Sequence, residues 1–288
     1  MPKKIVNHGV LRGWRDTDFV AGYIPYEVRN PSGNWLPFAP VGEKQHSNIV
    51  DNMDCVSEAC NNVCEIQIKQ QTGETVDFAD RYLANMSGTT SSGNWVYLVL
   101  DWWRNQGCVL ESVWPRPSNP NYTWNEYYSP IPQSVINQAK AQSLDKYKLE
   151  YERISDKSAS SVNYHLKHAP LMITLPGHEV AGIVLAANGN VLTYLDSYDP
   201  FIKTINLSAV DVIYKAVLTV KGIGMAKVLN DNGTIRIEFG SGSQGFNIGV
   251  ASSSLHQQIV ASGEPILQQP ATTPEKLTLS EGMIIHSK

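Results

Sequence analysis

The sequence predicts an α+β protein with a helical half, an antiparallel-sheet half and a small C-terminal β module. Apolar residues recur at helical spacing in segments 54–71 and 93–107 of the first half. Three β-rich runs follow within residues 171–198. After about Val220 the pattern changes to short alternating strands with Asn-Gly and Gly-Ser turns. Helices followed by strands, rather than alternating with them, indicate an α+β fold.

The helical half is expected to begin with one long helix. Asp51 or Asn52 is a suitable N-cap for it, and Gly73 is a suitable stop. A second strong helix ends at Gly107. Shorter helices are expected at 78–86, 131–144 and 158–169. The Pro-, Asn- and aromatic-rich residues 113–133 predict a long loop.

The sheet half contains a strong hairpin signal, Asn188-Gly189, between two β-rich runs. Residues 1–40 lack a long period and predict an extended segment that wraps over another part of the protein. We therefore divide the chain into an extended N-terminal segment (1–40), a main domain (41–220) and a β-rich C-terminal module (221–288).

Composition excludes several classes of function. The chain has 42% hydrophobic and 17% charged residues, which is ordinary for a globular protein, and a net charge of −4. Only the pair Lys3-Lys4 is clustered, so the basic footprint of a nucleic-acid-binding protein is missing. The first residues lack the apolar run of a signal peptide, and the apolar stretches are too short to span a bilayer. We expect a soluble protein, cytoplasmic or virion-associated, with no nucleic-acid or membrane partner.

One cysteine stands out from the other three. The spacing of Cys55, Cys60, Cys64 and Cys108 does not fit a zinc site, and a disulfide would require an oxidising compartment that the sequence does not indicate. We expect neither a metal nor a cofactor. Cys55 falls in the first turn of the predicted long helix, where the helix dipole favours a thiolate. Cys55 is therefore expected to have a lowered pKa and to be the most reactive thiol.

The residues around Cys55 resemble the papain family of cysteine peptidases. DNMDCVSEACNNV is similar to the family's nucleophile segment, and SSGNWVYLVLDWWRNQGCVLESVWP to a later helical segment. GHEVAGIVLAANGNVLTYLDSYDPF is similar to the segment that carries the family histidine. The resemblance covers roughly residues 40–217. It implies a papain-like fold with two lobes and a peptidase activity.

The resemblance also implies a role for each site residue. His178 takes the place of the family histidine, and Asp196 that of the asparagine that orients it. An aspartate can serve because it also accepts from an imidazole N–H. The family's oxyanion glutamine lies six residues before the cysteine, where this chain has Ile49. Gln45 is the favoured substitute, and Asn52 is the alternative.

These residues predict cleavage of peptide bonds in a polypeptide or peptide substrate through an acyl-enzyme on Cys55. Three alternatives stay open, one of which is an unrelated α+β binding protein whose resemblance to the family is accidental. The same Cys–His pair would serve an amidase that acts on cell-wall peptides. A papain-like fold could also be a structural or docking component of a larger assembly such as a virion, held by the N-terminal segment or the C-terminal module. The displaced glutamine, and Val56 in place of the family's tryptophan, favour that last function.

Overall fold

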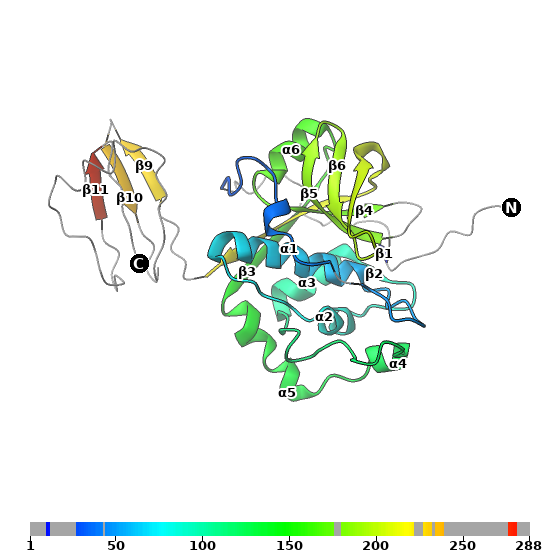
Figure 1. The fold of residues 1–288 in the computed structure, drawn as a ribbon. Coiled ribbons are helices and arrows are strands. Elements are labelled where there is room, and N and C mark those ends of the chain that lie inside the picture. Colours follow the sequence, from blue (N-terminus) through cyan, green and yellow to red (C-terminus); the bar gives the residue numbers. More distant parts are fainter. Residues whose placement is uncertain are drawn as a thin grey trace. The chain divides into compact units, whose positions relative to one another are not determined.

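The computed structural model describes residues 10–11, 27–42, 44–175, 180–221, 227–231, 234–238 and 276–280 (Figure 1). The chain divides into two compact units, Met1–Thr219 and Val220–Lys288. This division lies beside the boundary expected after residue 220. Independent folding of the C-terminal module stays a prediction.

The long helix α1 (Cys55–Thr72) is the central element of the larger unit. It packs against α2 (Asp80–Met86) and α3 (Val96–Gln106) on one side and against the sheet on the other (Figure 1). The helix ends at Gly73, which adopts the left-handed conformation expected of a C-cap (φ 77°). Its N-cap is Asp54 rather than Asp51 or Asn52, and the Asp54 side chain makes no capping hydrogen bond. The helix therefore begins at Cys55 itself.

The remaining helices are short. They are η1 (Leu36–Phe38), α4 (Trp124–Tyr127), α5 (Gln133–Ile136), the π-helix η2 (Lys140–Leu144), α6 (Ala159–Leu166) and η3 (Leu207–Ala209). The segment expected to be a loop contains α4, because Thr123 and Glu126 form a reciprocal capping box. The single helix expected over 131–144 is divided into α5 and η2.

A six-stranded antiparallel sheet forms the other lobe, with the order β3-β8-β4-β5-β6-β7. The strands are β3 (Tyr147–Ile154), β4 (Leu171–Leu175), β5 (Val180–Asn188), β6 (Val191–Leu195), β7 (Ile202–Asn206) and β8 (Ile213–Val220). The hairpin predicted at Asn188-Gly189 joins β5 to β6, with Gly189 at φ 59°. The sequence patterns did not single out β3, β7 or β8. The predicted α+β class is confirmed.

The described part of the N-terminal segment is tied to both lobes. Strand β1 (Val10–Leu11) pairs in parallel with β2 (Asn94–Trp95) in the helical lobe. Trp35 is completely buried, and its Nε1 donates to the Leu166 carbonyl oxygen at 2.7 Å. Its backbone N–H donates to the Leu185 carbonyl oxygen in β5 at 2.7 Å. These contacts make the described residues of the segment part of the packed unit.

The smaller unit contains a three-stranded antiparallel sheet with the order β11-β10-β9. Its strands are β9 (Lys227–Asp231), β10 (Thr234–Glu238) and β11 (Lys276–Ser280). The other short strands expected in this module lie outside the described residues. In the described part of the chain, no helix has the length and apolar character needed to cross a bilayer.

Candidate active site

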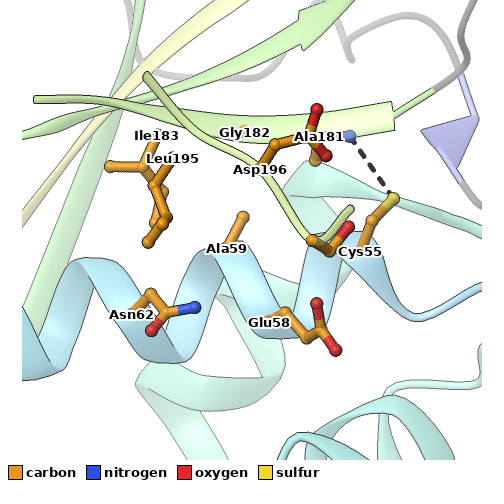
Figure 2. Close-up of a pocket in the computed structure, with 10 residues that line it drawn as sticks. Cys55, Glu58, Ala59, Asn62, Ala181, Gly182, Ile183, Leu195 and Asp196 are labelled. Atoms are coloured by element: carbon orange, nitrogen blue, oxygen red, sulfur yellow. Dashed lines mark hydrogen bonds between the residues drawn. The ribbon is translucent and has the colours of Figure 1, made fainter. Parts of the chain in front are cut away.

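Cys55 lies at the junction of the two lobes. It is the first residue of α1, and its sulfur accepts a hydrogen bond from the Ala181 backbone N–H in β5 at 3.3 Å (Figure 2). The side chain is completely buried. The N-terminus of the helix and the beginning of the strand thus meet at the thiol.

Electrostatics at the thiol differ from the expectation. Burial raises the pKa of Cys55 well above its usual range, and the Ala181 N–H opposes this only in part. The carboxylates of Asp54, Glu58 and Asp51 raise it further. A helix N-terminus favours an anion by about 0.3–1 kcal/mol, whereas an unpaired buried charge costs far more. The prediction that Cys55 has a lowered pKa is therefore wrong.

The proposed base, His178, lies outside the described residues, so its distance to Cys55 stays a prediction. It precedes Ala181 by three positions in the chain. Two other histidines, His165 and His168, have partners elsewhere in the fold. His165 Nδ1 lies 3.2 Å from the Lys215 ammonium group, and His168 Nδ1 lies 3.0 Å from the Glu27 carbonyl oxygen.

Asp196 follows the end of β6 and lies beside the same hollow as Cys55 (Figure 2). Its carboxylate is buried and already bonded. Lys203 Nζ contacts Oδ2 at 2.7 Å, and the Tyr198 backbone N–H donates to Oδ1 at 3.2 Å. Lys203 is a partner that the sequence analysis did not anticipate.

The hollow itself separates α1 from strands β5 and β6 (Figure 2). Its lining residues are Cys55, Glu58, Ala59, Asn62, Ala181, Gly182, Ile183, Leu195, Asp196 and Ser197. A Cβ on Gly182 would lie 2.9 Å from the Leu195 carbonyl oxygen, so only glycine lets β5 and β6 approach this closely. The close approach of β5 and β6 fixes the position of Asp196, which follows β6, beside the hollow.

Of the two candidate oxyanion side chains, Gln45 is the one joined to this hollow. Gln45 is completely buried, and its Oε1 accepts from the hydroxyl of Ser197, which lines the hollow, at 2.8 Å. The Asn52 amide instead donates to the Tyr122 hydroxyl at 2.8 Å, in the aromatic loop before α4. Gln45 is thus the candidate that contacts a residue of the hollow, and its role at the oxyanion stays a prediction.

A buried charge cluster along α1 was missed by the sequence analysis. Arg116 lies 2.9 Å from Glu58 and 3.8 Å from Asp80. Burial raises the pKa of Asp54 from 3.8 to about 6, although Arg116 and a hydrogen bond from the Tyr127 hydroxyl lower it. Glu58 follows Asp54 at helical spacing, so both carboxylates lie on the same face of the helix. This spacing was the sequence feature that could have predicted the cluster.

All four cysteines are reduced and buried. Burial also raises the pKa values of Cys64 and Cys108. Among the described residues, no group of three or more His, Cys, Asp or Glu side chains is placed to hold a metal ion.

No protein-family model and no curated protein sequence matches the chain. Solved structures do match. Xylellain, a cysteine protease from Xylella fastidiosa, is 12% identical with a TM-score of 0.54, over 76% of this chain and 97% of that chain. The fold is papain-like. Digestive procathepsin L 3 of Tenebrio molitor is 13% identical with a TM-score of 0.49, over 73% and 76% of the two chains. At these identities the likeness is one of fold, and activity needs its own evidence.

Proposed function

We propose that this chain is a cysteine-dependent hydrolase that cleaves peptide bonds, with Cys55 as the nucleophile. One observation carries the proposal. Cys55 begins the central helix of this papain-like fold, and its sulfur accepts a hydrogen bond from the Ala181 backbone N–H. Ala181 lies three residues after His178 in the chain. The papain-like arrangement requires this meeting of the nucleophile helix with the strand that follows the histidine.

The proposed reaction has two steps. His178 takes the Cys55 proton as the sulfur attacks the substrate carbonyl carbon, and the C–N bond then breaks while His178 protonates the leaving amine. Water, activated by His178, hydrolyses the resulting thioester and restores the thiol. Burial raises the pKa of Cys55, so removal of its proton by His178 is a necessary part of the attack.

Two further side chains have roles in this proposal. Asp196 orients the imidazole, and the ion pair with Lys203 holds the Asp196 carboxylate in place. Gln45 and the Cys55 backbone N–H donate to the oxyanion. Loss of one such donor typically costs about 10²–10³ in turnover.

The first test combines labelling and turnover. Limiting iodoacetamide followed by peptide mapping should label Cys55 before the other cysteines, because Cys55 is the one that lines the hollow. Cys55→Ala and His178→Ala should each abolish hydrolysis of fluorogenic peptides. Cys60→Ala is the matched control, because it removes an equally buried thiol from the same helix. Equal labelling of all four thiols, or turnover that survives Cys55→Ala, would contradict the proposal.

The role of Asp196 has a separate test. Asp196→Asn should keep substantial turnover per folded molecule, because an amide oxygen still accepts from an imidazole N–H. Asp196→Ala should lose most of the turnover, since the ring could then adopt the wrong tautomer. Equal, near-normal rates for both variants would show that Asp196 only stabilises the end of β6.

A second candidate function is supported by the burial of the thiol. Cys55 is inaccessible to solvent, and three carboxylates oppose its ionisation. A papain-like fold kept as a structural or docking component of a larger assembly needs no reactive thiol. A folded wild type that neither hydrolyses peptides nor reacts with iodoacetamide at Cys55 would favour this function.

A further inference from the structure

A closed network of polar side chains joins the loop before α1 to the loop after β6. Ser197 donates from its hydroxyl to Gln45 Oε1 at 2.8 Å, and Gln45 donates from Nε2 to Asp51 Oδ1 at 2.6 Å. Tyr198 donates from its hydroxyl to Asp51 Oδ2. Because Ser197 and Tyr198 are adjacent in the chain, these bonds form a ring that spans both loops.

This ring fixes the orientation of the Gln45 amide. The nitrogen faces the Asp51 carboxylate, which can only accept, so a flipped amide would lose that bond and place its oxygen against the carboxylate. The backbone is held as well. Gln45 N–H donates to the Ser197 carbonyl oxygen at 3.3 Å, and Asn52 N–H donates to the Gln45 carbonyl oxygen at 3.1 Å.

Asp51 is the residue on which the ring depends. Its Oδ1 also accepts from the Met53 backbone N–H at 2.9 Å, in the turn that leads into the helix. The extra residues between Gln45 and Cys55 form a loop closed by the antiparallel bridge between His46 and Asp51. The bridge makes the chain turn back on itself, so that Asp51 lies beside Gln45 although Gln45 is further from Cys55 in the sequence than the family glutamine is from its cysteine.

We infer that Asp51 is a positioning residue that aims the Gln45 amide at the oxyanion formed during hydrolysis. The inference rests on the proposed function. Asp51 acts through Gln45 and does not touch the reacting atoms. In the family motif, a shorter spacing in the chain holds the glutamine near the cysteine. Here the contact with the Asp51 side chain holds Gln45 in place, and Tyr198 links Asp51 to the sheet lobe.

The test is a cycle of Asp51→Asn and Gln45→Ala, measured as kcat and KM on a fluorogenic peptide. Gln45 and Tyr198 donate to different oxygens of Asp51, and the asparagine nitrogen that replaces one of them cannot accept a hydrogen bond. We expect Asp51→Asn to lower kcat about tenfold or more with little change in KM, since an oxyanion donor acts in the transition state. Adding Asp51→Asn to Gln45→Ala should cost little more, because the two act as a unit.

A second readout separates positioning from general loosening. Alkylation of Cys55 by iodoacetamide forms no oxyanion, and the Asp51 carboxylate opposes thiolate formation. Alkylation of Asp51→Asn should therefore be as fast as in the wild type or faster, while turnover falls. Asp51→Glu keeps the charge but displaces it, so it should lose turnover as well. This variant decides the matter if Asp51→Asn does not fold.

The matched control is Asp199→Asn. Asp199 joins the same two loops through an exposed ion pair with Lys44 at 3.0 Å, and exposed pairs contribute little. An active wild type in which Asp51→Asn and Asp51→Glu match Asp199→Asn would overturn the role of Asp51 alone. An inactive wild type would overturn the proposed function, and the role of Asp51 with it.

Discussion

Replacing Asp54 with asparagine should stabilise the protein at neutral pH and leave its stability at pH 4 nearly unchanged. Asp54 is almost completely buried at the N-terminus of α1. Its Oδ2 accepts from the Tyr127 hydroxyl. Within the described part of the chain, its Oδ1 is buried without a hydrogen-bond partner. The carboxylate is thus desolvated and only half satisfied.

The magnitude follows from the pKa. Burial raises the pKa of Asp54 from 3.8 to about 6. The folded protein therefore holds the proton through a range of pH in which the unfolded chain has released it. Stability falls as the pH rises from about 4 through about 6, and the loss is complete near pH 7. A shift of this size corresponds to about 3 kcal/mol. Asparagine does not ionise, so Asp54→Asn avoids this loss.

The assay is chemical unfolding of both proteins at pH 4, 6 and 8. The difference in unfolding free energy should grow by up to about 3 kcal/mol between pH 4 and pH 8 in favour of the variant. Cys55 provides a second readout. Because the Asp54 charge raises the pKa of Cys55, Asp54→Asn should speed alkylation of that thiol at pH 8. A stability difference that stays the same at every pH would refute the reasoning.

Three further predictions concern stability and use the same unfolding assay. Arg116→Met should destabilise the protein by about 3–5 kcal/mol, because it removes the cation that contacts two buried carboxylates; an effect below about 1 kcal/mol would contradict this. Met53→Gly should stabilise by about 0.5–1 kcal/mol, because Met53 has a left-handed φ of 57°, which costs about 1–2 kcal/mol in a residue with a side chain; a loss of stability would show that its side-chain contacts matter more. Gly182→Ala should cost about 1–3 kcal/mol through the clash with Leu195 and should slow any turnover by shifting Asp196; unchanged stability would mean that β6 moves freely.

Much of the fold follows from local patterns in the sequence. The span of α1, the stop of α3 at Gly107 and the hairpin at Asn188-Gly189 were all predicted, and the structure confirms them. Each depends on apolar spacing plus one residue that can adopt a left-handed or turn conformation. Strand β8 was not recognised, because its first six residues are all buried and show no alternation of exposed and buried positions.

The site was predicted less completely, for a different reason. Gln45 was selected on residue type alone, since only the fold brings Ser197 and Asp51 to the two ends of its amide. Lys203 lies seven residues beyond Asp196, and it reaches that carboxylate because β6 and β7 pair across a turn. The contribution of His178 remains a prediction, because it lies outside the described residues.

The sequence by itself determined that a cysteine lies in the first turn of a long helix of an α+β fold, because helix spacing and stop residues act over a few positions. Only the tertiary structure decided the electrostatic state of that cysteine. Its pKa depends on how deeply the thiol is buried and on carboxylates around it, and burial follows from the packing of β5 against α1. A helix N-terminus contributes a small, local and favourable term, whereas desolvation is larger and arises from every element that excludes water from the site.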